Sequence, residues 1–353
     1  MGGAQAPVPP APLPPAWRWA GPPLAAGFAA GVALRRICYA LGLKQPRRAP
    51  IPVVSVGNLT VGGTGKTPLV AWLARGLLER GRKPAILMRG YGAARPGELN
   101  DEARELARLL PQAPVFANPD RYASALKASA QGCDVALLDD GFQHWRLARN
   151  LDVVLLDATD PLGGGHLLPW GRLREGPAAL ARAGAVVCTR ANLVAPERLA
   201  EAQRIASLAA PHAVWAVCEH RPARLRRLFG ANETQDAEAL AGKRVLAACG
   251  LGHPEAFYAT LERLGAQLAG KLTYPDHFDY ARAGWTEMVE AAGRYQPEVV
   301  VVTGKDAAKL EALEPAGQTL PPLWALEIEA RFLEGEGALW ARIDEALARP
   351  AAT

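Results

Sequence analysis

The sequence predicts an α/β fold: a doubly wound, mostly parallel sheet that carries a phosphate-binding loop (P-loop), with a second, smaller α/β domain joined by a short β-linker. Three observations predict this fold. Short apolar segments alternate with helical patterns along most of the 353 residues, as in parallel sheets with helices on both faces. The first of these segments ends in a glycine-rich turn followed by Gly65-Lys66-Thr67. The alternation starts again at Lys243, beyond the basic stretch 221–227, which indicates a second domain.

Composition supports two cores and a reducing compartment. Hydrophobic residues make up 50% of the chain, which is ample for a nucleotide-binding domain over 44–220 and a second lobe over 221–353 that closes a cleft. The net charge of +5 favours anionic partners without identifying them. The five cysteines are isolated and form no CxxC pair, which indicates reduced thiols in a cytosolic compartment rather than a zinc site or disulfides.

The N-terminal region is divided into two parts. Residues 1–15 are rich in Pro and Ala and are expected to be disordered. Residues 16–43 contain an apolar helical run with two Trp at one end and Arg35 and Arg36 at the other. The run is shorter than the ~20 residues that span a bilayer. This pattern favours a helix lying in a membrane interface, and the alternative is a core helix packed on the nucleotide domain.

Residues 52–70 have the order of a P-loop: a Val-rich strand, a glycine-rich turn and a helix. In such a loop, backbone N–H groups and the positive helix end hold the phosphates, while a Lys reaches the terminal phosphates and a Thr hydroxyl meets Mg²⁺. Thr60 stands where the strict pattern has Gly. The alternative is a chance glycine-rich turn before a helix. The predicted nucleotide-binding residues are Gly62, Gly63, Thr64, Gly65, Lys66 and Thr67.

Further strands are expected on both sides of the domain boundary. In the first domain they are residues 84–88, 115–117, 134–138, 152–156 and 185–188. In the second they are residues 243–250, 298–303 and 323–330. The last of these alternates with period two and could pair with residues 213–219, which would join the domains. Ligands of such sheets bind beyond the carboxyl ends of the strands.

An apolar strand ends in Asp139-Asp140, followed by Gly-Phe-Gln-His144. In a P-loop enzyme, a Mg²⁺-holding Asp belongs at this place because the hard cation needs oxygen ligands beside the β- and γ-phosphates. Two Asp after a strand can also be turn chemistry. The P-loop one strand–helix series earlier favours the metal interpretation.

Other polar residues have two possible roles. Asp101-Glu102 could be the first turn of a capped helix, and Asp276-His277 could be a satisfied turn pair. Their functional interpretation is an Asp–His partnership that deprotonates a hydroxyl nucleophile. Arg121 and Arg174 could clamp phosphate or be solvated surface charges.

Together these residues resemble the tetraacyldisaccharide 4′-kinase family, the lipid A 4′-kinases of Gram-negative bacteria. The resemblance covers the chain from about Trp17 to Lys309. Its most specific parts are the joined P-loop and the Asp139–His144 string. Two motifs depart from the family pattern. Gly-Asp-Glu-Pro appears as Asn100-Asp101-Glu102-Ala103, and Thr-Glu-Lys-Asp appears as Thr303-Gly304-Lys305-Asp306.

The resemblance implies transfer of the γ-phosphoryl group of ATP, with Mg²⁺, to the 4′-hydroxyl of a tetraacyldisaccharide 1-phosphate. The product is lipid IVA, an intermediate of lipid A and lipopolysaccharide biosynthesis. Residues 44–220 are then a kinase domain that acts on a lipid A disaccharide precursor. The resemblance also implies a peripheral, monotopic enzyme at the cytoplasmic face of the inner membrane, held by the 16–43 helix.

The resemblance further implies roles for single residues. Asp101, supported by His277, is the candidate base. The implied catalytic group also contains Lys66, Asp139 and Asp140; the metal would be held by Thr67, Glu102 and Asp139; and the site would be lined by Arg121, His144, Arg174 and Glu175.

The main competing hypothesis is a P-loop switch or assembly ATPase that acts through a protein partner. A guanine-specific switch usually carries Asn-Lys-x-Asp after a late strand, whereas this chain has Cys-Thr-Arg-Ala-Asn at 188–192. A soluble small-molecule kinase is a second alternative, against which the apolar N-terminal segment argues. The dispersed basic residues and the lack of an aromatic stacking platform argue against nucleic-acid binding, and no obligate protein partner is evident.

Overall fold

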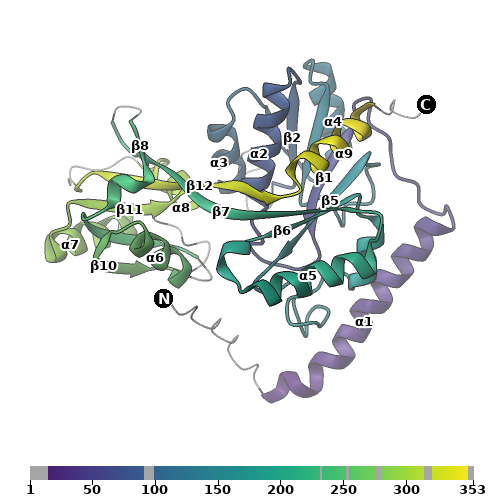
Figure 1. The fold of residues 1–353 in the computed structure, drawn as a ribbon, viewed down its shortest axis with the longest axis horizontal. Coiled ribbons are helices and arrows are strands. Elements are labelled where there is room, and N and C mark those ends of the chain that lie inside the picture. Colours follow the sequence, from purple (N-terminus) through teal and green to yellow (C-terminus); the bar gives the residue numbers. More distant parts are fainter. Residues whose placement is uncertain are drawn as a thin grey trace. The chain divides into compact units, whose positions relative to one another are not determined.

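Two groups of residues each form a compact unit with its own core. The computed structural model describes residues 15–90, 99–230, 233–251, 254–275, 278, 280, 282–313 and 320–348. Of the described residues, those within 1–98, 109–220 and 330–353 form the first unit, and those within 99–108 and 221–329 form the second. Figure 1 labels the elements of both units.

The first unit contains a seven-stranded run of parallel strands in the order β7-β6-β5-β1-β4-β2-β3. The central strand β1 thus lies between β5 and β4, as in a doubly wound sheet. The strands are β1 (Val53–Asn58), β2 (Pro84–Met88), β3 (Val115–Ala117), β4 (Val135–Asp139), β5 (Leu151–Asp157), β6 (Ala185–Thr189) and β7 (Val214–Arg227).

Helices cover both faces of this sheet. Ala125 and Ala128 of α4 form one buried cluster with Val53, Leu87 and other strand residues. Successive strand residues point to opposite faces, and the neighbouring residue Val54 is also fully buried. Helix α2 packs on β1, β2 and β4 and covers this second face. The helices are α1 (Pro15–Ala40), α2 (Lys66–Glu79), α4 (Arg121–Ala130), α5 (Pro196–Ala209) and α9 (Glu336–Ala348).

The register brings the carboxyl ends of the central strands to one edge. Val56 of β1 is paired with Asp139 at the end of β4, and Asn58 is paired with Leu155 of β5. Asp157 at the end of β5 is paired with Thr189 at the end of β6. The polar residues that follow these strands therefore share one edge, where ligands of parallel sheets bind.

The second unit has a smaller sheet in the order β10-β9-β11-β12, with parallel pairing throughout. Strand β12 neighbours β7, and β8 pairs antiparallel with β7. The strands are β8 (Thr234–Asp236), β9 (Arg244–Cys249), β10 (Gln267–Thr273), β11 (Val299–Thr303) and β12 (Leu323–Glu334). The helices are α3 (Asp101–Leu109), α6 (Pro254–Arg263), α7 (Arg282–Tyr295) and α8 (Gly304–Leu310).

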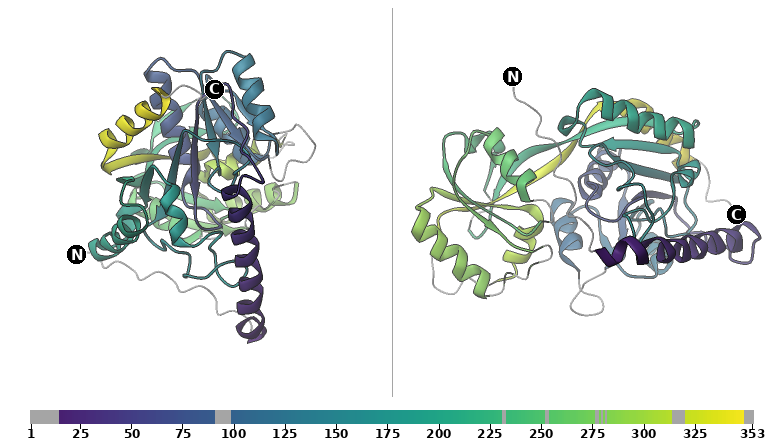
Figure 2. Two further views of the ribbon diagram at one scale, coloured as in Figure 1. Left: turned by 90° about the vertical axis from the view of Figure 1, so that its right-hand side faces the viewer. Right: turned by 90° about the horizontal axis from the view of Figure 1, so that it is seen from below.

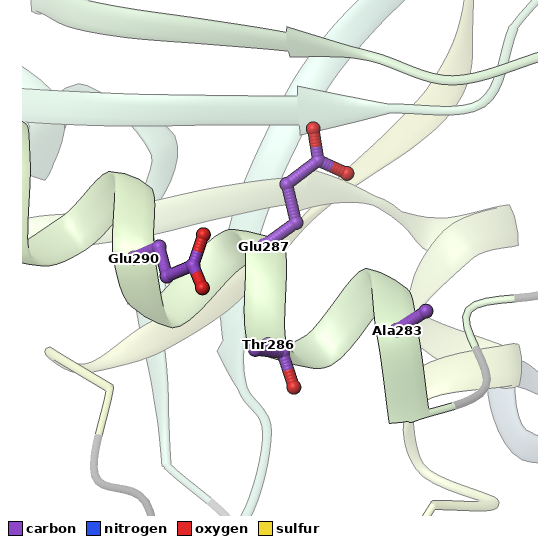
Figure 3. A pocket seen from close by; sticks show the side chains of 4 residues that line it. All are labelled: Ala283, Thr286, Glu287 and Glu290. Carbon is purple, nitrogen blue, oxygen red and sulfur yellow. The ribbon is translucent and has the colours of Figure 1, made fainter.

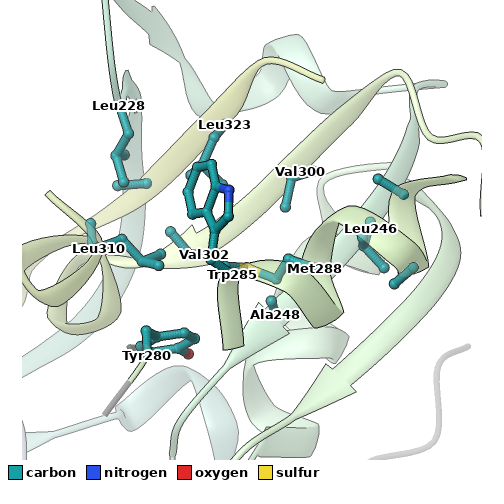
Figure 4. Close-up of a cluster of buried hydrophobic side chains, with 14 of the residues drawn as sticks. Leu228, Leu246, Ala248, Tyr280, Trp285, Met288, Val300, Val302, Leu310 and Leu323 are labelled. Carbon is teal, nitrogen blue, oxygen red and sulfur yellow. The ribbon is translucent and has the colours of Figure 1, made fainter. Parts of the chain in front are cut away.

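Both faces of the second sheet are buried. Leu246 and Val300 lie in a cluster with Trp285 and Met288 of α7 (Figure 4). The neighbouring residue Val245 lies in a separate cluster that includes residues of α6. Covered faces on both sides explain why β9 and β11 are continuous apolar runs rather than alternating ones.

The predicted fold class is confirmed, and the boundary at residue 220 coincides with the change of unit. Two segments differ from the predicted domains: residues 99–108 group with the second unit, and residues 330–353 with the first. Residues 330–353 belong to the first unit because Trp340 of α9 packs on Trp72 of α2, with ring centroids 4.9 Å apart.

Strand β7 continues through the basic stretch 221–227, where Arg224 and Arg226 form ion pairs with Glu327 of β12. The expected pairing is confirmed at the level of the strands, since β12 neighbours β7, and Glu327 of β12 contacts the later half of β7.

Helix α1 is a single long helix at the outside of the first unit (Figure 2). It confirms the predicted helix, whereas residues 1–14 lie outside the described residues. None of the helices in the described parts of the chain is long and apolar enough to cross a bilayer.

We predict that Trp340→Ala lowers the free energy of unfolding by about 3 kcal/mol, because a buried indole is replaced by a cavity against α2. Trp340 is 7% exposed and also lies under the guanidinium of Arg80. Urea denaturation measures the loss. The control is Leu208→Ala, at a side chain that is 73% exposed, with an expected cost below about 0.5 kcal/mol. Equal costs would show that α9 does not pack on α2.

Candidate active site

The P-loop is closed by the last residue of β1. The side-chain amide of Asn58 donates to the hydroxyls of Thr64 (2.9 Å) and Thr60 (3.4 Å), and its oxygen accepts a hydrogen bond from Nζ of Lys66 (3.3 Å). These contacts span the loop from its first residues to the start of α2. They also explain Thr60, since its hydroxyl is an acceptor in this network where the strict pattern has Gly.

Two residues at the end of β6 donate side-chain hydrogen bonds to the P-loop backbone. The Thr189 hydroxyl donates to the carbonyl of Thr64 at 3.0 Å, and the Arg190 guanidinium donates to the carbonyl of Gly63 at 2.6 Å. The N–H and C=O of a trans peptide point in opposite directions. A carbonyl of Thr64 held by Thr189 therefore directs the N–H of Gly65 to the other side, as phosphate binding by loop amides requires.

Gly65 is the N-cap of α2 and requires glycine for two reasons. Its φ of 82° lies in the left-handed region, where a side chain is disfavoured. A Cβ at this position would also lie 1.9 Å from Cε1 of His220. The His220 ring fills this space, and burial lowers its pKa to about 4. The imidazole is therefore neutral at physiological pH.

The carboxylate of Asp140 is shared by two cations. Lys66 Nζ lies 3.5 Å from Asp140 Oδ1, and Nη1 of Arg174 lies 2.9 and 2.7 Å from the two carboxylate oxygens. Burial alone would raise the Asp140 pKa, but the charges and hydrogen bonds of Lys66 and Arg174 outweigh it and lower the pKa. Asp140 is thus ionised and lies between the P-loop Lys and a second cation.

The segment that follows β4 is linked to β1 and to the Arg174 segment. Gln143 donates to the carbonyl of Asn58 and to Glu175 Oε1, each at 3.1 Å, and accepts from Arg174 at 3.3 Å. Arg182 makes two hydrogen bonds of 2.9 Å to Glu175. Glu175 is therefore held in an ion pair with Arg182, which favours a supporting role over direct participation in phosphoryl transfer.

Arg121 and His144 lie in a positively charged part of the first unit. Arg121 is 6% exposed; burial and then the charge of Arg89 lower its pKa, while Asp140 and Asp139 oppose that shift. Burial, followed by the charge of Arg121, lowers the His144 pKa to about 4. His144 is therefore a neutral hydrogen-bonding group at pH 7. Asp139 is itself 6% exposed, at the end of β4.

The first unit therefore brings together most of the predicted residues. Sequence reasoning did not assign four residues of this arrangement to the site. These are Asn58, Arg182, Arg190 and His220. The Asn58 side chain contacts residues only two to eight positions away in the chain, whereas Arg182, Arg190 and His220 contact residues far away in the chain.

In the second unit, Asp101 and Glu102 begin α3. Oδ1 of Asn100 accepts a hydrogen bond from the N–H of Ala103 at 3.1 Å, so Asn100 caps the helix. Nζ of Lys309 lies 3.6 Å from Asp101 Oδ2. The cap interpretation is correct for Asn100, and the Asp101 carboxylate at the helix start is paired with Lys309. The predicted partner, His277, lies outside the described residues.

The chain is similar to a known protein family over nearly its whole length. The family model for tetraacyldisaccharide-1-P 4′-kinase matches residues 17–348. The chain belongs to the tetraacyldisaccharide 4′-kinase family. It is 43% identical over 349 residues to a tetraacyldisaccharide 4′-kinase of Anaeromyxobacter sp. strain K, covering 93% of this chain and 91% of that protein. It is 40% identical to one from Alkalilimnicola ehrlichii, covering 95% of each.

A solved member of the tetraacyldisaccharide 4′-kinase family has the same fold. The structure of LpxK from Aquifex aeolicus, described as an "apo" form in complex with ATP, matches with a TM-score of 0.72 and 28% identity. The match covers 92% of this chain and 98% of that one. The similarity therefore extends over both units rather than over the P-loop alone.

The oxygen donors of this tetraacyldisaccharide 4′-kinase family member fit a Mg²⁺ ion. Mg²⁺ usually takes one or two carboxylates together with phosphate and water rather than an all-protein cage. Asp139 supplies a buried carboxylate at the end of β4, and Thr67 lies in the first turn of α2. Among the described residues, no group of three or more His, Cys, Asp or Glu lies close enough together to hold a metal ion.

A surface depression on α7 is separate from these residues. It is lined by Ala283, Thr286, Glu287 and Glu290 (Figure 3), none of which belongs to the predicted site of the kinase family. We assign no ligand to it.

We predict that Gly65→Ala destabilises the protein by about 2–3 kcal/mol, which combines left-handed strain with collision against His220. Gly81→Ala is the matched control, because Gly81 has a φ of 73° and an added Cβ there would meet open space. The left-handed backbone strain alone should cost about 1 kcal/mol. The double variant Gly65→Ala/His220→Ala should remove the collision. Urea denaturation measures all three, and equal costs for the two single variants would contradict the described packing.

Proposed function

We propose that this protein transfers the γ-phosphoryl group of ATP to the 4′-hydroxyl of a tetraacyldisaccharide 1-phosphate, giving lipid IVA. Family membership supports this activity, since relatives at 38–44% identity are named tetraacyldisaccharide 4′-kinase. The observation that carries the proposal is the P-loop Lys66 paired with Asp140 at the edge where β1 and β4 end. No observation favours the switch ATPase.

The proposed nucleotide site is the loop from Gly62 to Thr67. Amides of this loop and the N-terminus of α2 would hold the β- and γ-phosphates of ATP, and Lys66 would move from Asp140 toward the phosphates. Mg²⁺ would neutralise developing charge, with Thr67 and Asp139 as ligands in the first unit. Glu102 is the further proposed metal ligand.

The remaining roles follow from the chemistry of phosphoryl transfer. The protein must position the reactants, neutralise charge and accept the proton of the attacking hydroxyl. Asp101 is the proposed base, and His277 its proposed support. Arg121 and Arg174 are cations that would stabilise negative charge on the phosphoryl group. His144 and Glu175 would complete the lining, His144 as a neutral donor or acceptor.

Helix α1 supports a peripheral position on the cytoplasmic face of the inner membrane. Leu34, Ile37 and Leu41 are 63%, 51% and 68% exposed. Exposed apolar side chains next to basic ones are typical of helices that lie in a membrane interface. Such a helix would bring the enzyme to a substrate whose acyl chains stay in the bilayer.

We expect the purified protein with Mg-ATP to phosphorylate a tetraacyldisaccharide 1-phosphate in detergent at the 4′ position, as read by mass spectrometry and NMR of the product. Lys66→Ala should lower kcat/KM by about 100-fold or more, because it removes charge stabilisation of the transferred group. Asp101→Asn should lower kcat by about 100-fold with little change in ATP affinity. No transfer by the wild type, together with ATP hydrolysis stimulated by a protein, would favour the switch ATPase instead.

A second experiment tests the membrane role of α1. The triple variant Leu34→Ser/Ile37→Ser/Leu41→Ser should lose binding to anionic vesicles by about tenfold or more, since each exposed apolar side chain contributes to partitioning. Vesicle flotation measures the bound fraction. The control replaces three exposed Leu outside α1 with Ser: Leu126, Leu193 and Leu208. If both triple variants bind as the wild type does, α1 is not the membrane-binding element.

A further inference from the structure

Two faces of α1 have different surroundings. At about 100° per residue, Leu34 and Ile37 of α1 form one exposed apolar stripe with Leu41, which directly follows the helix. Arg35 and Tyr39 are four residues apart, so they lie together on a different face. Contacts of this second face with the rest of the first unit are therefore compatible with a free apolar stripe.

The Arg35 face contacts the segment that follows the Asp139-Asp140 pair. Nη2 of Arg35 donates to the backbone carbonyl of Gln143 at 2.6 Å. The Arg35 guanidinium also lies 5.6 Å from the centroid of the Trp145 ring, and the Tyr39 ring meets Trp145 edge-on at 5.3 Å. One turn of α1 thus contacts both the main chain and the indole of this segment.

The contacted segment is connected to the P-loop. The Gln143 side chain accepts from Arg174 at 3.3 Å and donates to the Asn58 carbonyl at 3.1 Å. Arg174 holds Asp140, which pairs with Lys66 at 3.5 Å. Every step from α1 to the P-loop Lys is therefore a hydrogen bond or an ion pair within the first unit.

The same segment is stacked on a second cation. The Arg182 guanidinium lies 4.6 Å from the centroid of the Trp145 ring and 4.2 Å from that of Phe142. Trp145 therefore has cation contacts from both α1 and the 177–182 segment. Cation–π contacts of this kind are worth most where the groups are partly desolvated, as Trp145 is half-buried.

We propose that Arg35 is a positioning residue, which ties the membrane-facing helix to residues 140–145 and so sets Asp140 and Gln143 in place for phosphoryl transfer. Arg35 is not a catalytic residue, because it acts through the Gln143 carbonyl and Trp145. The expected effect of Arg35 on kcat rests on the proposed function. Whether Arg35 orders residues 140–145 can be tested without any activity.

Arg36 provides a matched control. It follows Arg35 on α1 and is exposed, and in the described part of the chain no hydrogen bond or ion pair joins it to another residue. Arg35→Ala and Arg36→Ala each remove one positive charge from the same helix. Any loss of attraction to anionic lipid is therefore shared by both variants, and the difference between them measures the Arg35 contacts.

The first measurement needs no activity. Amides of the segment are hydrogen-bonded locally, with His144 N–H on the Gly141 carbonyl and Gly141 N–H on the Val56 carbonyl. Hydrogen exchange read by mass spectrometry should be faster in a peptide covering 140–147 for Arg35→Ala than for Arg36→Ala. Equal exchange in the two variants would overturn the proposal.

The second measurement is kinetic, in detergent micelles that contain the disaccharide substrate. Arg35→Ala should have a kcat roughly tenfold below that of Arg36→Ala, since a charged donor to a backbone carbonyl is lost. KM for ATP should change little. Arg35→Lys should recover part of kcat, because an ammonium can still donate to the carbonyl.

Two outcomes separate the possible failures. A change confined to KM for the lipid acceptor would overturn the proposal and make Arg35 a substrate-binding residue. If the wild type transfers no phosphoryl group to the disaccharide, the proposed function fails, while the exchange comparison still decides whether Arg35 orders residues 140–147.

Discussion

The arrangement of the first unit depends on one carboxylate, that of Asp140, which is held between Lys66 and Arg174. Asp140 has a φ of 51°, a left-handed conformation that costs free energy for a residue with a side chain. Two charge-assisted contacts offset that cost. They require β1 and β4 to be neighbours with Val56 paired to Asp139, because only this register brings the P-loop and the Asp139-Asp140 turn to the same edge.

Local motifs were predictable because their information lies within a few residues. A Val-rich strand, a glycine turn and Gly65-Lys66-Thr67 together predict a P-loop, and buried parallel strands are typically continuous apolar runs. The return of α9 to the first unit was not predictable, since Trp340 could have packed on any apolar surface. Nor could the sequence show that His220, some 150 residues after the P-loop by chain position, fills the space beside Gly65; only tertiary packing places it there.

The two departures from the family motifs are accommodated by the surrounding structure. Asn at position 100 is a strong N-cap residue, and its side chain caps α3 through the N–H of Ala103. Gly304 leaves room for a carboxylate from another helix, because a Cβ there would lie 2.5 Å from Oε1 of Glu105. Burial raises the Glu105 pKa to about 7, so this carboxyl group is easily neutralised beside the buried Asp306. Departures of this kind change local contacts without changing the elements that carry Asp101 and Lys309.

Under the proposed function and the proposed role of Arg35, helix α1 would meet two requirements at once. The proposed binding to a lipid surface needs an exposed apolar stripe, whereas the proposed phosphoryl transfer needs an ordered Asp139–His144 segment. A helix can satisfy both because residues one or two positions apart lie on different faces. Leu34 and Ile37 are exposed on one face, while Arg35 reaches the Gln143 carbonyl from another. Phosphoryl transfer depends on positioning more than on covalent chemistry, so the proposed positioning of residues 140–145 by Arg35 would contribute to the reaction without Arg35 acting on the phosphoryl group itself.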